Sequence, residues 1–530
     1  MLWKIERFLG YVVTEIFVKM NSPIFRYIII VSIGALIALY VTFSLFTGDG
    51  NKIGGFFRYI TALGVIISLW QPRMGILLLI ASSGYLDMVK RFTLLDSSVS
   101  QIDIASVLVF APLLVAGMTL NTILSWMTRG INQDTKLEMK IFIVCLLWAG
   151  LSMIPVIAGS GLRTAGNALN YFAYVFLFLQ VPRYFKDPLF VKKSIVTLVV
   201  AYIPVMALAL HEGNYGYNKI TMDYLLSGYT GQIRQLADAR PGAMSTLAGP
   251  PGLSLMMSLI GVYLILPFSF SGKFAFIRRG VFVSVPLAIL FFIAAYYTFA
   301  RTGWVVGFIF LGVVTVLYMN KAVIYLCGFT GVGLLGVLYL SAGYLVENDT
   351  MHVFEERIRG NEYTDAGRQT TSLGTFNGRL ASMNQVVSDP EMWTPFGFKL
   401  SDKKVSDLRY PVHEGVGNLL VRIGYIPFTL LAIGGFLFVR KTLNLNSRLK
   451  NGAMTHQIRV FSALGIACLA TAIGHGQTMF SFPINVLWAL AFSMALGIYL
   501  KMNEEKESEK MSLQDSGEDL SVLPNEIATV

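Results

Sequence analysis

The sequence predicts an all-helical membrane protein that crosses the bilayer many times. Apolar residues make up 55% of the chain and charged residues only 14%, whereas a soluble domain carries roughly 25% charged residues. The mean hydropathy is +0.61. The apolar residues also gather into stretches of about 20, the length that a helix needs to cross the hydrocarbon core. We therefore expect one polytopic transmembrane domain over residues 27–500.

The apolar stretches predict about fourteen transmembrane helices. They lie near 27–46, 53–70, 74–87, 103–126, 139–158, 166–182, 194–210, 250–269, 280–300, 303–319, 322–345, 415–438, 459–474 and 480–500. Only Gln71, Pro72 and Arg73 separate the second stretch from the third. The largest polar loop, 346–412, would join helices 11 and 12, and a second long loop covers 211–249. Loops of this length are usually functional or disordered.

The two ends of the chain differ from this apolar pattern. Residues 1–26 mix charges into an apolar sequence without a clear cleavage site. This pattern favours an N-terminal interfacial helix over a cleavable signal peptide. Residues 501–530 are polar and rich in Glu, Asp and Ser, a composition typical of a disordered tail.

The net charge of +11 comes from basic residues spread over short loops on one side of the expected bundle. Cytoplasmic loops carry such an excess, and an even number of spans places both termini on that side. The absence of a single basic patch argues against nucleic acid as a partner. Three cysteines all fall in apolar stretches, so neither a disulfide framework nor a cysteine metal site is expected: Cys145, Cys327 and Cys468.

Three residues that could take part in catalysis are expected on the opposite, outer face. Arg301 opens RTGW after an apolar run, Arg379 closes FNGR in the largest loop, and His413 stands where that loop re-enters the membrane. Two guanidiniums can hold a diphosphate, and an imidazole can accept a proton near neutral pH. Each also has a plainer interpretation: a headgroup anchor, a solvated loop arginine and a loop histidine.

Four further residues are secondary candidates. Arg240 lies in DARPGAMSTLAGPPG, Arg163 in the short loop GSGLRTAG, and His475 in IGHGQTMF. Glu414 could orient His413 or favour a helix N-terminus. The sequence HEGVG is not a zinc motif, because HExxH needs a second histidine one helical turn later. We therefore expect no metal site.

Three segments resemble the bacterial O-antigen ligase and O-antigen polymerase family. ARTGWVVGF is similar to the family's arginine signature, and FNGRLASMNQVVSDPEMWTPFGFKL to its Gly-Arg stretch with a Pro-x-Gly turn, here Pro395 to Gly397. PVHEGVGNLLVRIGYIPFTLL resembles its re-entry motif, with His413 and a later Gly424. The likeness covers roughly residues 230–440. Many ligases have His-Asn at the re-entry where this chain has His413-Glu414, and the span count fits polymerases better than ligases.

The resemblance implies a membrane glycosyltransferase of the bacterial inner membrane. Its donor would be an undecaprenyl-diphosphate-linked glycan at the periplasmic face. Arg301 and Arg379 would bind the diphosphate, and His413 would deprotonate or position the acceptor hydroxyl, with inversion at the anomeric carbon. Further substrate-binding candidates are Arg240, Arg163, Glu414 and His475. No metal and no cofactor is required in this scheme.

The resemblance leaves the acceptor open. A ligase passes the glycan to lipid A–core, and a polymerase passes it to a second lipid-linked glycan. Membrane lipids and a polysaccharide-assembly complex are the other expected partners. The span count slightly favours a polymerase of O-antigen or exopolysaccharide.

A non-enzymatic alternative is a polysaccharide flippase or secondary transporter. Such proteins often have inverted repeats and charged residues near the bilayer midplane. This sequence has no evident repeat, and its apolar stretches are nearly free of acidic residues. A structural scaffold of an export complex would require neither Arg301 nor His413.

Overall fold

The structure is a computed structural model of the chain. It describes the following residues: 53–95, 101–129, 132–227, 242–266, 281–318, 362–363, 369–370, 388–390, 393–397, 420–421, 423–448, 453–474 and 481–515. The N-terminal segment 1–26, the first expected span and the span expected at 322–345 lie outside these residues, as does Cys327.

The described part of the chain is helical apart from one short strand pair. Its helices are α3 (Ile53–Trp70), α4 (Pro72–Ser82), α5 (Leu86–Leu95), α6 (Gln101–Arg129), α7 (Gln133–Phe172), η1 (Ala173–Gln180), η2 (Val181–Phe185), α8 (Pro188–Tyr215), α9 (Lys219–Leu226), α10 (Pro250–Ile265), α11 (Val281–Tyr297), α12 (Arg301–Tyr318), α18 (Tyr425–Arg448), α19 (Ala453–Gly474) and α20 (Ile484–Asp515). The strands β1 (Glu362–Tyr363) and β2 (Gln369–Thr370) pair antiparallel.

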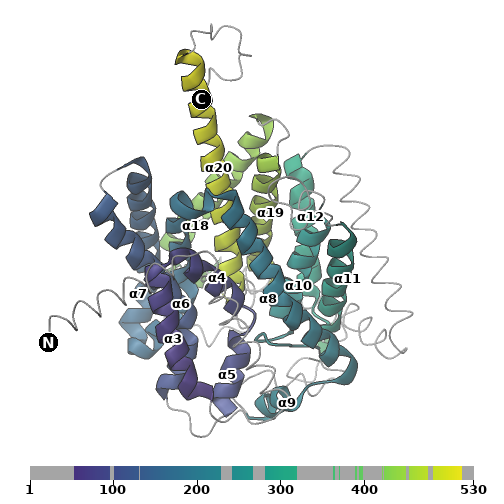
Figure 1. Cartoon of the computed structure of the whole chain (residues 1–530). Helices are drawn as coiled ribbons and strands as arrows, with labels where there is room; N and C mark the ends of the chain where they lie inside the picture. The colour runs from purple at the N-terminus through teal and green to yellow at the C-terminus, as the bar shows by residue number, and fades with distance from the viewer. Residues whose placement is uncertain are drawn as a thin grey trace, which may run out of the picture.

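The helices pack side by side as a bundle, and the end of α20 projects beyond it (Figure 1). Among the described residues, three helices are long and apolar enough to cross a membrane: Ile104–Trp126, Pro188–Tyr215 and Ile484–Glu505. Shorter apolar helices accompany them, among them Pro72–Ser82, Pro250–Ile265 and Thr302–Leu317. An all-helical protein with strongly apolar helices is therefore confirmed.

The narrow boundary expected between the second and third spans is present. Helix α3 ends at Trp70, and α4 begins at Pro72. Proline suits the first turn of a helix because its missing N–H has no partner there in any case. Pro72 therefore ends one apolar helix and starts the next with a single intervening residue, Gln71.

Three expectations need correction. The segment around Arg163 is not a loop, because α7 continues unbroken through it from Gln133 to Phe172; its glycines weaken a helix but do not stop it. The loop expected at 211–249 begins later, since α8 runs to Tyr215 and α9 follows. The tail expected to be disordered from residue 501 is helical as far as Asp515, because its Glu and Lys residues are good helix formers.

Helix α10 is buried along nearly its whole length. It contacts α11 and α12, while α3 contacts α6 and α19 contacts α20. Other helices expose large apolar side chains, including Tyr59, Leu63 and Ile66 on α3, Val144 and Leu147 on α7, and Phe282 on α11. Contiguous apolar surface of this kind indicates contact with lipid or with a partner.

Helix α8 connects the two ends of the bundle. Asp187 caps its N-terminus by accepting a hydrogen bond from Leu189 N at 3.0 Å. Its C-terminus is followed by Gly216, whose φ of 84° suits glycine. The roughly 25 residues from Asp187 to Glu212 span about 37 Å at 1.5 Å per residue. This length exceeds the hydrocarbon thickness of about 30 Å, so α8 is long enough to cross a bilayer with a polar group beyond each surface of the hydrocarbon.

Candidate functional site

The structure places two of the predicted site residues. Arg301 is the first residue of α12, and Arg163 lies within α7. The other five lie outside the described residues: Arg379, His413, Glu414, Arg240 and His475. The candidate site is therefore taken as the described residues around Arg301 together with the described parts of the other motif segments.

A tight turn joins α11 to α12 immediately before Arg301. Phe299 in this turn has a φ of 51°, in the left-handed region that non-glycine residues rarely adopt. Thr298 Oγ1 accepts a hydrogen bond from Ala300 N at 3.1 Å, and Ser254 Oγ donates to Ala300 O at 3.0 Å. These contacts fix the direction in which α12 starts.

Gly303, within RTGW, lets α12 approach α10 closely. A Cβ atom at this position would lie 2.2–2.4 Å from the Oγ, O and C atoms of Ser254. One turn later, a Cβ on Gly307 would have ordinary contacts of 3.6 Å with Ser258 and Val262. The first glycine of this segment is therefore required by a backbone contact, which holds the start of α12 against the start of α10.

The segment before α10 is attached to the same turn. Ala243 N donates to Tyr297 O at 2.9 Å, and Tyr217 Oη donates to Gly242 O at 2.6 Å. Tyr297 Oη in turn donates to Asn214 Oδ1 at 2.8 Å. The end of α8, the segment from Gly242 to Gly249 and the α11–α12 turn thus form one connected structure at the base of Arg301.

A buried arginine holds this segment from one side. Arg91, on α5, is 1% exposed. Its Nη1 donates to Ser245 O at 2.7 Å and to Thr221 Oγ1 at 3.2 Å, and its Nη2 donates to Leu247 O. The guanidinium also lies 5.7 Å from the ring centroid of Tyr224, a cation–π distance.

A buried carboxylate holds the same segment from the other side. Glu212, near the end of α8, is 3% exposed. Its Oε2 accepts from Met244 N at 2.9 Å and Ser245 N at 2.6 Å, and its Oε1 accepts from Thr221 Oγ1 at 3.4 Å. We call Arg91, Glu212, Thr221, Ser245 and Leu247 the Arg91 cluster.

Burial outweighs pairing in the pKa values of the Arg91 cluster. Burial lowers the pKa of Arg91, and the nearby charges of Glu212 and Asp87 act in the opposite direction. Burial also raises the pKa of Glu212, against the charge of Arg91 and the hydrogen bonds from Ser245 and Met244. Arginine side chains are not deprotonated in proteins, so Arg91 stays charged. The cluster is therefore an ionic clamp on backbone groups.

Two other motif segments meet in the structure. Gly424 has a φ of 82°, and a Cβ there would lie 2.3 Å from Gly397 N and 2.5 Å from Phe396 Cα. Tyr425 N donates to Thr394 O at 3.0 Å, and Ile426 N donates to Pro395 O at 3.2 Å. The Pro-x-Gly turn thus packs on the glycine that follows the His413 segment, and α18 starting there contacts α12.

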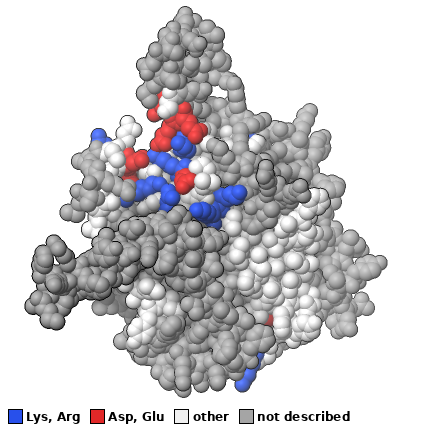
Figure 2. All heavy atoms as spheres, viewed as in Figure 1, with Lys and Arg blue, Asp and Glu red and all other residues white. Residues whose placement is uncertain are grey.

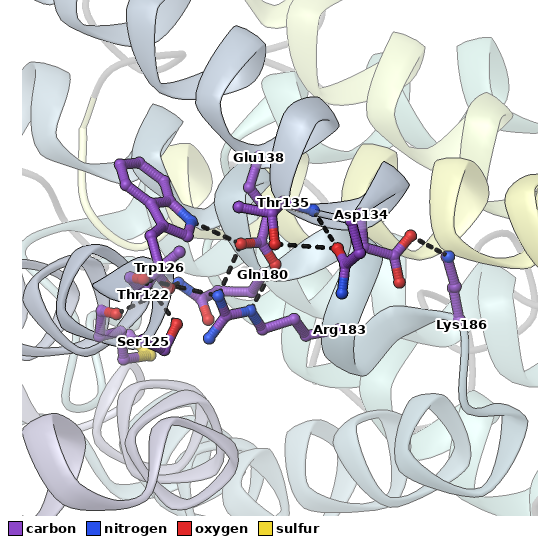
Figure 3. A network of polar contacts seen from close by, with 11 residues as sticks. Thr122, Ser125, Trp126, Asp134, Thr135, Glu138, Gln180, Arg183 and Lys186 are labelled. Atoms are coloured by element: carbon purple, nitrogen blue, oxygen red, sulfur yellow. Dashed lines mark hydrogen bonds and ion pairs between the residues drawn. The ribbon is translucent and has the colours of Figure 1, made fainter. Parts of the chain in front are cut away.

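A second polar cluster lies at the other end of α8. Arg183 Nη2 donates to Glu138 Oε2 at 2.6 Å, and Arg183 Nε donates to Glu138 Oε1. Trp126 Nε1 donates to the same carboxylate at 2.7 Å, as Figure 3 shows. Lys186 Nζ donates to Asp134 Oδ1 at 2.7 Å. We call these five residues the Arg183 cluster.

The surroundings of the Arg183 cluster are rich in charge. Lys186 also contacts Glu504 on α20, and Arg73 pairs with Asp187 at 3.3 Å. Burial opposes the charge of Lys186, but its hydrogen bonds to Asp134 and Glu504 outweigh burial and raise its pKa. Figure 2 shows acidic and basic residues gathered around the base of α20.

Neither cluster was identified from the sequence. Arg91 and Glu212 lie just after apolar stretches, in LDMVKRF and LALHEGN, and a charge in that place is costly unless paired. This signal was available, but it does not reveal the partner. Within the described residues, no group of three or more His, Cys, Asp or Glu residues could hold a metal ion.

In comparisons with known proteins, no protein family, no curated protein and no solved structure matches the chain.

Proposed function

We propose that this protein is a membrane glycosyltransferase that takes a glycan from an undecaprenyl-diphosphate-linked donor at the periplasmic face of the bacterial inner membrane. In this proposal it is a polytopic protein of about fourteen spans, with both termini in the cytoplasm and its largest loop on the periplasmic side. Arg301, Arg379 and His413 carry the chemistry. The order of the three motif segments in the sequence suggests this assignment.

The proposed reaction is a single displacement. An acceptor hydroxyl attacks the anomeric carbon, the bond from that carbon to the diphosphate oxygen breaks, and undecaprenyl diphosphate leaves. Arg301 and Arg379 neutralise the charge that develops on the diphosphate. His413 accepts the hydroxyl proton. Arg301 stands at the N-terminus of α12, where the helix dipole also favours an anion.

The observation that carries the proposal is that two glycines of the motif segments, Gly303 and Gly424, make close contacts with backbone atoms of other segments. Gly303 brings the start of α12 onto Ser254, and Gly424 receives the turn that ends at Gly397. Catalytic arginines need fixed positions, because electrostatic stabilisation depends on groups that do not reorganise during the reaction. The contact of Gly303 with Ser254 beside Arg301 supports this proposal, as does the contact of Gly424 with Phe396 and Gly397 at the start of α18.

The acceptor is proposed to be a second lipid-linked glycan, which makes the protein a polymerase of O-antigen or exopolysaccharide. A ligase acting on lipid A–core uses the same donor chemistry. The flippase or transporter alternative gains no support from the buried charges, since Arg91, Glu212, Arg183 and Glu138 lie toward the ends of α8 and not at its middle.

The test is transfer activity in cells that lack the chromosomal gene and carry plasmid variants. We expect Arg301→Ala and His413→Ala each to abolish transfer while the protein stays in the membrane at the normal level. Arg301→Lys should also fail, because lysine lacks the planar fork of donors. Surface glycans on a gel and extracts of the undecaprenyl-linked pool provide the two readouts.

Matched controls come from the same end of the bundle. Lys219→Ala removes an exposed cation at the start of α9. His211→Ala removes a histidine whose ring centroid lies 5.1 Å from that of Tyr215. Both variants should keep full activity. Single repeat units in the deletion strain identify a polymerase, and full-length polymer stranded on the lipid identifies a ligase. Full activity of Arg301→Ala or of His413→Ala would overturn the role assigned to that residue.

A further inference from the structure

A polar cavity of about 490 Å³ lies at the Arg183 end of the bundle, away from Arg301. This volume falls in the range of about 300–1,000 Å³ that small-molecule pockets occupy. The junction of α3 and α4, the start of α7 with the preceding Asn132, and helix η2 together form its wall. Its lining includes Trp70, Arg73, Asp134, Glu138, Arg183 and Tyr184.

The charges of the lining are balanced. The lining contains two guanidiniums, Arg73 and Arg183, and two carboxylates, Asp134 and Glu138. Arg183 pairs with Glu138, whereas Arg73 pairs with Asp187 and Asp134 pairs with Lys186, both outside the lining. A purely anionic or purely cationic ligand would find no net attraction in such a cavity. A group that carries one charge of each sign matches it better, because each half can meet an opposite charge.

One lining residue, Arg183, also has a buried donor that the protein leaves unused. Arg183 is 6% exposed, and its Nη1 has no hydrogen-bond partner among the described residues. A buried polar group without a partner is costly, so an acceptor that reached this nitrogen would be bound favourably. Arg73 and Asp134 are each 46% exposed at their side chains and so remain within reach of a ligand.

An apolar path leads along α3 to this cavity. Tyr59, Leu63, Ile66 and Trp70 recur at helical spacing and are all exposed by more than a third of their surface. Trp70 ends α3 and also lines the cavity. Tryptophan is enriched where the hydrocarbon meets the headgroups, and an exposed apolar stripe on a membrane helix is suited to a lipid chain.

We propose that this cavity binds the headgroup of a zwitterionic aminophospholipid, with its acyl chains along the α3 stripe. Arg183 and Arg73 hold the phosphate, which suits guanidinium groups, and Asp134 holds the ammonium. The site is separate from Arg301, and the proposal does not depend on the glycosyltransferase activity.

The test is native mass spectrometry of the purified full-length protein. The protein is delipidated and then exposed to an equal mixture of phosphatidylethanolamine and phosphatidylglycerol with identical acyl chains. We expect the wild-type protein to retain phosphatidylethanolamine over phosphatidylglycerol by about tenfold. Equal retention of the two lipids would overturn the proposal.

Asp134→Asn removes the carboxylate assigned to the ammonium and should reduce the preference to about one. Asp134 is half-exposed, so this change is milder than removing Arg183, which would leave Glu138 buried without its partner. Glu504→Gln is the matched control: Glu504 contacts the same Lys186 but does not line the cavity. The Glu504→Gln variant should prefer phosphatidylethanolamine over phosphatidylglycerol as strongly as the wild type. An unchanged preference in Asp134→Asn would contradict the assignment of Asp134 to the ammonium group.

A soluble competitor distinguishes the lipid from its headgroup. Phosphoethanolamine has both charges of the headgroup but no chains. If the α3 stripe contributes, phosphoethanolamine should fail to displace the bound lipid at equal concentration. Displacement as effective as that by the whole lipid would mean that the site takes a soluble phosphate compound and would overturn the lipid as its occupant.

Discussion

The Arg91 cluster and the Arg183 cluster lie at opposite ends of α8, and they use buried charge differently. Arg91 and Glu212 bind mainly backbone groups, from the carbonyls of Ser245 and Leu247 to the amides of Met244 and Ser245. Arg183 binds chiefly the side chain of Glu138. The first arrangement fixes the course of a loop, and the second ties helices together around a cavity.

This difference indicates where the molecule requires one fixed conformation. The segment from Gly242 to Gly249 has little regular structure, yet Ala243, Met244, Ser245, Thr246 and Leu247 are buried in it. Buried backbone groups outside helices need other partners, and the charged side chains provide them.

The largest effect is expected from Arg91→Met. The change leaves Glu212 buried without its cation and the carbonyls of Ser245 and Leu247 without donors. We expect a loss of about 5 kcal/mol, at the upper end for one partner of a buried charge pair, measured by thermal unfolding in detergent. Lys219→Ala, an exposed change nearby, serves as control. A small loss in Arg91→Met would mean that the backbone clamp is dispensable.

At the other end, Arg183→Met should cost about 3 kcal/mol, because Glu138 stays buried but keeps its bond from Trp126. The double variant Arg183→Met with Glu138→Met should recover most of this loss, since both charges are then gone. The four proteins of this cycle are compared by the same unfolding measurement. Additive losses would show that the two side chains do not act as a pair.

A smaller effect is expected where α12 meets α10. Gly303→Ala forces the two helices apart, which typically costs about 1–3 kcal/mol, and it should reduce glycan transfer by displacing the start of α12. Gly307→Ala, one turn later, has room for the methyl group and should be close to neutral or slightly stabilising. Equal stability and equal glycan transfer in the two variants would mean that the backbone contact at Gly303 does not position the start of α12.

The smallest effects are expected at Asp187, which caps α8 and pairs with Arg73. Asp187→Ala removes both interactions and should cost about 1 kcal/mol. Asp187→Asn keeps a capping oxygen and loses only the partly exposed ion pair, worth about 0–1 kcal/mol. If Asn is as damaging as Ala in thermal unfolding, then the ion pair matters more than the cap.

The fold was largely accessible from local sequence patterns. Apolar stretches placed α6, α8 and α20, and Pro72 separated α3 from α4, because each signal acts within a few residues. The continuous α7 was missed because glycine near Arg163 resembles a helix end in sequence, while its actual cost in a helix is only about 1 kcal/mol. Neighbouring helices can readily supply that amount.

The candidate site was accessible only in part. The RTGW motif placed Arg301 just before an apolar stretch, and in the structure Arg301 is the first residue of α12. The roles of Arg301, Arg379 and His413 stay predictions. The partners of Arg91 and Gly303 could not be inferred, since they depend on which distant segments meet in space. A charged residue beside an apolar stretch signals that a partner exists, and only the folded chain identifies Ser245 and Leu247.

The length of α8 has a consequence for the membrane around it. Its polar ends are held about 37 Å apart by a helix whose two termini are each bound to other parts of the bundle, so the separation cannot adjust freely. A thicker bilayer would draw one cluster into hydrocarbon, and a thinner one would expose apolar side chains to water. Hydrophobic mismatch costs fractions of a kcal/mol per Å. For the proposed membrane protein, we therefore expect stability to peak in lipids whose chain length matches this separation.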